Sequence, residues 1–128
     1  MSPTEDPEPI TTSLETVDGT TTVVVAGEID LSTAPRVESA VAQASTALRD
    51  RSRGDEGSGT DASLVVDMRG VSFCDSHGLS ALLRSEAAAT GHGVSVRLRV
   101  VPGSLVARAL ERSGLSQVLS LEHVAGGS

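Results

Sequence analysis

Lysine, tryptophan and tyrosine are missing from this sequence, which contains one phenylalanine and one cysteine. Its ten basic residues are therefore all arginines, and its net charge at neutral pH is −7. A nucleic acid partner is not expected, because phosphates attract positive charge and unpaired bases stack on aromatic rings. The single cysteine cannot form a disulfide within the chain.

Long apolar runs are also missing, so neither a signal peptide nor a membrane span is predicted. We therefore expect a cytoplasmic protein. The 128 residues fit one domain, and 38% of them are apolar, enough for an ordinary core of valine, leucine and alanine. We predict a single domain over residues 10–124. Residues 1–9, which are acidic and proline-rich, are expected to form a disordered tail.

The first half of the predicted domain indicates a hairpin and then a helix. β-Branched runs at residues 11–17 and 20–26 flank the dipeptide 18–19, Asp-Gly, which is a strong hairpin signal. From residue 37 to residue 48, apolar residues recur at helical spacing. Residues 50–63 are polar and glycine-rich, so we predict a flexible insertion loop there.

The helix predicted over residues 37–48 has its own start signals. Ser32 or Thr33 can cap its N-terminus, and Pro35 suits a first turn, where its missing N–H group costs little. We therefore expect the chain to enter this helix soon after residue 33.

The second half alternates strands with helices. Residues 64–74 indicate a strand that continues toward the core, and the helix after it is expected to begin at residues 75–76. Residues 94–101 alternate as a half-buried strand does, and residues 104–114 carry the signals of a capped helix. Residues 115–124 suit either a short strand or a helical turn. The order β-β-α-β-α-β-α predicts an α/β fold, with a mixed sheet of four to five strands and helices packed against it.

Two acidic junctions between a strand and a helix are candidate sites, because sites in such sheets form where strands end and helices begin. Glu28 and Asp30 follow an early strand, whereas Asp75 and Ser76 begin the second helix. A helix N-terminus favours an acceptor oxygen or an anion. On these residues alone, Asp75 or Ser76 would simply cap the helix.

The segment 65–83, VVDMRGVSFCDSHGLSALL, resembles the signature of STAS domains, specifically of bacterial anti-sigma-factor antagonists. The segment 27–30, Gly-Glu-Ile-Asp, resembles the second marker of that family. The resemblance covers residues 10–121. It implies a STAS fold and regulation of transcription by partner switching. The unphosphorylated antagonist binds an anti-sigma factor that is also a serine kinase, phosphorylation breaks the complex, and a phosphatase restores it.

The same resemblance assigns roles to individual positions. Ser76 would accept the phosphate, and Asp30 and Asp75 would lie on the surface that faces the kinase. His77 stands where the family has a second serine. It is either an exposed first-turn histidine or a partner of the phosphate that makes the switch sensitive to pH. The residues predicted to bind the partner are Asp30, Glu28, Asp75, His77 and Gly78.

Other functions fit less well. A hydrolase could use Cys74 or Ser76 with His77, but adjacent residues in a turn rarely activate one another, so we predict no enzymatic activity and no cofactor or metal. Asp67 ends a strand like the phosphoacceptor of a receiver domain, yet such domains need a lysine that is absent here. Asp67 is expected to cap or brace the following loop. A STAS scaffold or sensor-complex protein without a working phosphoswitch remains an open alternative.

Overall fold

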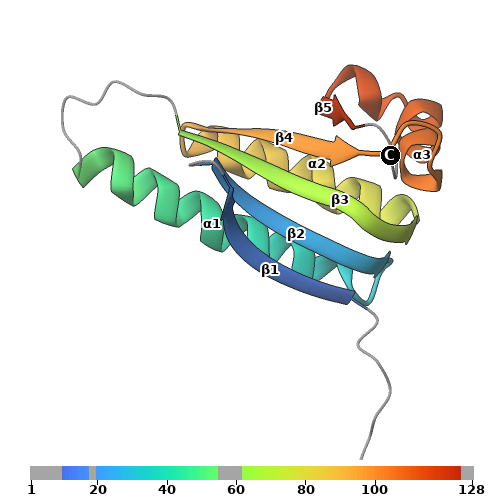
Figure 1. Cartoon of the computed structure of the whole chain (residues 1–128), viewed down its shortest axis with the longest axis horizontal. Helices are drawn as coiled ribbons and strands as arrows, with labels where there is room; N and C mark the ends of the chain where they lie inside the picture. The colour runs from blue at the N-terminus through green and yellow to red at the C-terminus, as the bar shows by residue number, and fades with distance from the viewer. Residues whose placement is uncertain (1–9, 18–19, 55–61, 125–128) are drawn as a thin grey trace, which may run out of the picture.

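The computed structural model describes residues 10–17, 20–54 and 62–124, which include three α-helices and five strands (Figure 1). Within this part of the chain, no helix is both long enough and apolar enough to cross a membrane. The elements in chain order are β1 (Ile10–Val17), β2 (Thr20–Ile29), α1 (Ala34–Gly54), β3 (Ala62–Cys74), α2 (Ser76–Gly91), β4 (Val94–Val100), α3 (Leu105–Ser113), the 3₁₀ turn η1 (Leu115–Gln117) and β5 (Ser120–His123).

The five strands form one mixed sheet in the order β1-β2-β3-β4-β5. β1 is antiparallel to β2, and each later strand is parallel to its neighbour. Parallel neighbours require a crossover, and α1 and α2 provide the connections from β2 to β3 and from β3 to β4. The two helices lie side by side against one face of the sheet (Figure 1). The predicted α/β fold is confirmed, with five strands.

The core lies between the sheet and the helices and is aliphatic, as the composition predicts. In β4, valines and a leucine at even positions are buried, whereas residues 95 and 97 are exposed and Arg99 is half-buried, which confirms the predicted alternation. On α1, Val37, Val41 and Ala44 are buried within the predicted stripe. Ser45, which no apolar pattern marked, is buried beside them.

The boundaries predicted for the loop at residues 50–63 need correction. α1 continues to Gly54, because a helix that has begun propagates at little cost through residues such as arginine. β3 already begins at Ala62, where Ala62 and Ser63 pair with Val94 and Ser95 of β4. The intervening residues 55–61 lie outside the described part, as do the predicted tail at residues 1–9 and the hairpin dipeptide 18–19.

The segment at residues 115–124, for which the sequence allowed a strand or a helical turn, contains both. η1 occupies Leu115–Gln117, and β5 at Ser120–His123 pairs in parallel with β4. The preceding helix α3 has the predicted ends: the Ser104 hydroxyl accepts a hydrogen bond from the N–H of Ala107, and Gly114 ends the helix in the left-handed region at φ 83°.

An ion-pair cluster lies on the sheet around Asp67, which is buried. Arg69 donates to both oxygens of Asp67, with its Nη2 2.8 Å from Oδ2, and its own N–H donates to Oδ1 at 3.1 Å. Arg99 Nη1 lies 3.7 Å from the same Oδ2, and Arg99 Nε lies 3.4 Å from Glu122. Asp67 therefore braces the backbone at residue 69, whereas the loop expected after Asp67 is part of the strand β3.

Candidate functional site

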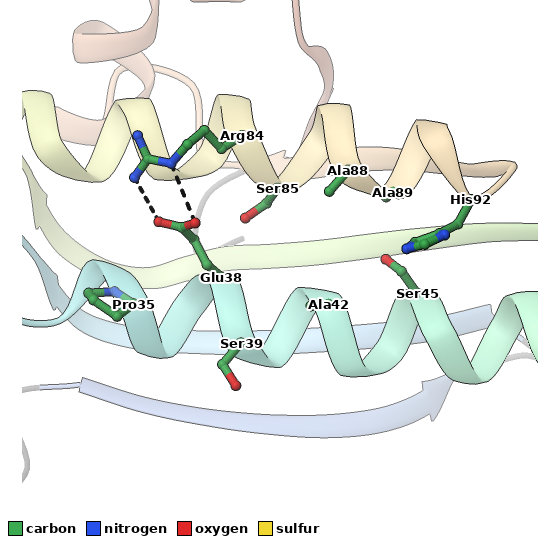
Figure 2. Close-up of a pocket in the computed structure, with 10 residues that line it drawn as sticks. All are labelled: Pro35, Glu38, Ser39, Ala42, Ser45, Arg84, Ser85, Ala88, Ala89 and His92. Carbon is green, nitrogen blue, oxygen red and sulfur yellow. Dashed lines mark hydrogen bonds and ion pairs between the residues drawn. The ribbon is translucent and has the colours of Figure 1, made fainter.

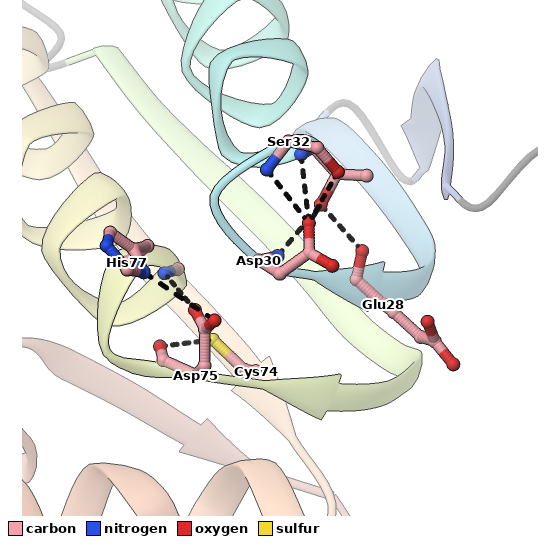
Figure 3. A network of polar contacts seen from close by, with 8 residues as sticks. Glu28, Asp30, Ser32, Cys74, Asp75 and His77 are labelled. Atoms are coloured by element: carbon pink, nitrogen blue, oxygen red, sulfur yellow. Dashed lines mark hydrogen bonds and ion pairs between the residues drawn. The ribbon is translucent and has the colours of Figure 1, made fainter.

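Both acidic junctions lie at the same edge of the sheet. β2 ends at Ile29 and β3 ends at Cys74, and these two residues are paired in the parallel register. The N–H of Asp75 donates to the carbonyl oxygen of Ile29 at 3.1 Å. This bond continues the pairing past the end of β3, so the loop after Asp30 and the start of α2 lie side by side (Figure 3).

Asp75, rather than Ser76, caps α2. Its backbone is extended, and its Oδ1 accepts from the N–H of Gly78 at 3.0 Å. Ser76 is the first helical residue and is exposed. Within the described part of the chain, the Ser76 hydroxyl has no hydrogen-bond partner. It is therefore open to solvent and free of a structural role that a modification would have to break.

His77 follows on the same exposed turn. Its Nδ1 lies 3.6 Å from Oδ2 of Asp75, the carboxylate oxygen that does not cap the helix. This contact becomes an ion pair when the imidazole is protonated. His77 thus already faces a carboxylate in the unmodified protein. Whether it also contacts a phosphate on Ser76 stays a prediction.

Gly78 has a packing role that differs from the predicted one. It is buried, and a Cβ at this position would lie 2.7 Å from both Cys74 Sγ and Ile29 Cγ2. Only glycine lets the first turn of α2 approach the strand ends this closely. Gly78 therefore packs beneath the first turn of α2, whereas Ser76 and His77 before it are exposed.

The loop after β2 is organised around Asp30. Its Oδ1 accepts from the Ser32 hydroxyl at 2.8 Å and from the N–H groups of Ser32 and Thr33 at 3.0 and 3.2 Å. The Ser32 hydroxyl is the largest cause that holds the pKa of Asp30 below its ordinary value of 3.8, and desolvation, the second-largest cause, opposes it. Asp30 is therefore ionised at neutral pH. Its carboxylate is held in one orientation.

Thr33 holds this loop in place through hydrogen bonds to backbone groups. It is buried, and its hydroxyl donates to the Glu28 carbonyl at 2.8 Å and accepts from the N–H of Asp30 at 2.9 Å. α1 then begins at Ala34, so the predicted position of the helix start is confirmed. The Asp30 loop reaches its shape through short-range bonds to backbone groups, as Figure 3 shows.

Glu28 is exposed, and Gly27 before it adopts φ 117°, a region that favours glycine. The register between β2 and β3 shifts at this point, between residues 27 and 28. Among the described residues, no arginine forms an ion pair with Glu28, Asp30 or Asp75. Within the described residues, no arginine therefore neutralises the negative charge at this edge of the sheet.

Sequence reasoning missed two apolar residues at this edge. Leu31 is 66% exposed, although it follows a strand end, and Phe73, expected to continue toward the core, is 47% exposed. Phe73 is paired with Glu28 across the register shift, which turns it outward. The signal in the sequence that could have predicted an exposed apolar residue here was Leu31, a leucine within a polar loop. We call the exposed or half-buried residues Glu28, Asp30, Leu31, Phe73, Asp75, Ser76 and His77 the strand-end face.

Cys74 lies behind this face and is buried. Burial, with a smaller contribution from the charge of Asp75, raises the pKa of its thiol to about 12. At neutral pH the thiol is therefore protonated, whereas a nucleophilic cysteine needs its thiolate. Cys74 fits the predicted role of a small core residue at a strand end.

The family comparison agrees with this architecture. The STAS domain model matches residues 11–125, and the chain therefore belongs to the STAS domain family. The five-stranded mixed sheet and its three helices are consistent with the STAS fold. No curated protein matches the chain in sequence.

Solved structures narrow the comparison to one kind of STAS protein. An anti-sigma factor antagonist from Mycobacterium paratuberculosis is 26% identical with a TM-score of 0.69, and the match covers 92% of this chain and 89% of that one. The anti-sigma factor antagonist SpoIIAA in its unphosphorylated form is 20% identical with a TM-score of 0.58, over 91% of this chain and 90% of that one. The second likeness concerns the fold alone. The protein is thus a STAS domain structurally similar to anti-sigma factor antagonists.

Proposed function

We propose that this protein is an anti-sigma-factor antagonist that regulates transcription by partner switching. In its unphosphorylated form it binds an anti-sigma factor with serine kinase activity, and phosphorylation of Ser76 releases that partner. The observation that carries the proposal is the state of Ser76, an exposed hydroxyl without a hydrogen-bond partner among the described residues, on the first turn of α2. It directly follows Asp75, whose N–H group is bonded to the carbonyl oxygen of Ile29, the residue before Asp30.

The charge of the strand-end face supports a switch by repulsion. A phosphate on Ser76 would add about −1.5 to −2 charges at neutral pH. These would join the carboxylates of Asp30 and Asp75, which no arginine in the described part of the chain neutralises. A partner complementary to the unmodified face would then meet excess negative charge, and a loss of about 1.4 kcal/mol in binding lowers affinity tenfold. The N-terminus of α2 favours an anion, so the domain itself stays folded.

The apolar residues of the face support a protein partner. Leu31 and Phe73 are large and exposed, and acidic side chains lie around them. Protein interfaces commonly combine a few apolar anchors with a polar rim. We infer that Leu31 and Phe73 are anchors and that Glu28, Asp30 and Asp75 select a partner with a basic surface.

The remaining parts of the proposal follow from this mechanism. The protein has no catalytic activity of its own, and the partner supplies the kinase. A serine phosphatase restores the unmodified form, and the complex works in the cytoplasm of a bacterium without contact to nucleic acid. The protonated thiol of Cys74 supports the absence of catalysis at this face.

A pair of variants tests the switch. The purified protein is first used to capture its partner from a lysate of the cell of origin. The captured protein is then identified, and we expect an anti-sigma factor of the ATPase type. We expect Ser76→Ala to bind this partner with or without ATP, and Ser76→Glu to bind it about tenfold more weakly than the unmodified protein. Thr46→Glu is the matched control, because Thr46 is exposed on α1, away from the strand-end face. Mass spectrometry after incubation with partner and ATP should locate the phosphate on Ser76.

Two outcomes would contradict the proposal. If both Ser76 variants bind the anti-sigma factor as the unmodified protein does, phosphorylation of Ser76 is not the switch. If capture recovers only copies of this chain, the protein is a STAS scaffold. The scaffold alternative would keep the fold and remove the phosphoswitch.

A further inference from the structure

A groove between α1 and α2 is separate from the strand-end face. Its volume is about 570 Å³, within the range of small-molecule pockets. Alanines and serines of the two helices form most of its lining (Figure 2). Small side chains on both helices leave this space unfilled. The lining residues used below are Ala42, Ser45, Ser85, Ala88, Glu38, Arg84 and His92.

Two buried hydroxyls line this groove without a hydrogen-bond partner. Ser45 is 1% exposed and Ser85 is 8% exposed, and neither Oγ atom is bonded. Both side chains point into the space between the helices (Figure 2). A buried hydroxyl is nearly always hydrogen-bonded, because leaving it unpaired is costly. These two oxygens therefore indicate that a polar group of a ligand completes the groove.

The groove is closed at both ends by bridges between the helices. At one end Arg84 Nη2 lies 2.7 Å from Glu38 Oε2, and at the other Arg49 Nη1 lies 3.1 Å from His92 Nδ1. Glu38 and Arg49 are separated by eleven residues of α1, which corresponds to roughly 16 Å. A helix of a partner would run across these bridges. A compact small molecule fits between them.

The two ends differ in the donors they can offer. Arg84 is paired with the carboxylate of Glu38. At the other end, Arg49 lies one turn after Ser45, and its buried Nε donor has no partner. Its Nη1 donates to Nδ1 of His92, and its Nη2 lies 3.5 Å from Oδ1 of Asp50. Arg49 does not itself line the groove, but its guanidinium contacts His92, which does. An acceptor at this end would therefore lie beside an arginine donor and the Ser45 hydroxyl.

We propose that the groove binds a small monocarboxylate with an apolar body. The carboxylate lies at the end formed by Ser45, Arg49 and His92, where arginine and hydroxyl donors favour it. The apolar body lies along the alanines, and Ser85 bonds a polar atom within it. This proposal does not depend on the function of Ser76.

The test uses 4-phenylbutyrate as the probe and 4-phenylbutylamine as its cationic counterpart. In two-dimensional amide NMR spectra, we expect saturable shifts of residues 42, 45, 85 and 88 with the acid and none with the amine. Ala88→Leu fills the groove at an exposed position and should weaken binding about tenfold or more. Ala87→Leu is the matched control, because Ala87 is also exposed on α2 but does not line the groove. Arg49→Gln should weaken binding of the acid to a similar degree.

Several results would overturn this assignment. Shifts that do not saturate, or that persist unchanged in Ala88→Leu, would show that the groove is not the site. Equal binding of acid and amine, or unchanged binding of the acid in Arg49→Gln, would show that the groove does not recognise a carboxylate. Self-association that Ala88→Leu abolishes, without any effect of the acid, would make the groove a contact between two copies of the chain.

Discussion

The protein stabilises its carboxylates in two different ways. Asp67, in the middle of the sheet, is buried and is bonded to the guanidinium of Arg69. Asp30 and Asp75, at the ends of the strands, are bonded to N–H groups and to two hydroxyls, which carry no net charge. The first arrangement cancels negative charge within the molecule. The second orients the carboxylates and leaves their charge directed at the surroundings.

The proposed switch relies on this difference. The charge balance around Asp67 would be costly to disturb, because a buried ion that loses its partner is left uncompensated. At the strand-end face, the fold depends on the Asp75 cap and the Asp30 loop but not on Ser76, whose hydroxyl makes no bond within the described part of the chain. Charge can therefore be added at Ser76 while the surrounding bonds remain. The variants below test whether stability and partner binding separate in this way.

The largest expected effect on stability comes from Asp67. Asp67→Ala removes the bonds to Arg69 and should lower the free energy of unfolding by about 1–3 kcal/mol. We expect the lower part of this range, because Arg69 is half exposed and water can solvate its guanidinium once Asp67 is removed. Asp30→Ala should lower the free energy of unfolding less than Asp67→Ala, because Asp30 lies at the surface and water can replace the bonds that its carboxylate loses. Urea denaturation of both variants provides the measurement. Equal losses would show that the two regions do not differ in their contribution to stability.

Phe73 should separate binding from stability. Phe73→Ala removes an exposed anchor, and we expect the affinity for the anti-sigma factor to fall about tenfold while the free energy of unfolding changes little. Val118→Ala is the control, because Val118 is 61% exposed but lies outside the strand-end face. Isothermal titration calorimetry measures both variants. An unchanged affinity for Phe73→Ala would exclude this residue from the interface.

A smaller effect is expected from the charge of Asp30. Asp30→Asn removes one exposed charge, and we expect a loss of affinity of about threefold to tenfold, mostly in the association rate and reduced at high salt. Asp67→Asn should leave the affinity of the folded protein unchanged, because Asp67 is buried beside its own arginines. Surface plasmon resonance at two salt concentrations tests both. A similar loss in both variants would mean that the contrast between the two regions has no bearing on binding.

The smallest effect is a dependence of stability on pH. The pKa of Asp30 is lowered mainly by the Ser32 hydroxyl. For Asp67, desolvation is the largest single cause and raises the pKa, but the hydrogen bonds and charge of Arg69, together with the charge of Arg99, lower it by more. Both folded-state pKa values lie below the ordinary value of 3.8, so the unfolded chain binds more protons in this range. Their contribution is present above about pH 4 and is lost as the pH falls through the folded-state values. Urea denaturation at about pH 5 and pH 3 should show a smaller decrease for Asp67→Asn. An identical decrease would contradict the contribution of Asp67.

Much of the architecture is predictable because it depends on short-range patterns. The alternation in β4, the Ser104 cap and the terminal Gly114 of α3 are each visible within a few residues. The motifs at residues 27–30 and 74–78 predicted the candidate site, and both motifs lie at one edge of the sheet. The expectation that Asp67 braces the following residues was also correct.

Other features depend on how distant segments meet. The outward position of Phe73 results from the register shift between β2 and β3, and the burial of Gly78 results from its approach to Ile29. Ser45 is buried because α2 packs beside α1, which no pattern within α1 predicts. The end of α1 and the start of β3 were misplaced because residues 50–63 carry weak signals of both loop and helix.

The sequence by itself determined that a helix starts at residues 75–76 and that Ser76 lies among acids, because capping depends on neighbours within one turn. Only the tertiary structure decided that Asp75 takes the cap and leaves Ser76 free, and that the Asp30 loop lies beside it. Ile29 and Cys74 are paired in the sheet, although α1 and the whole of β3 lie between them in the chain. Such a contact arises only when the crossover helix packs and the parallel strands align.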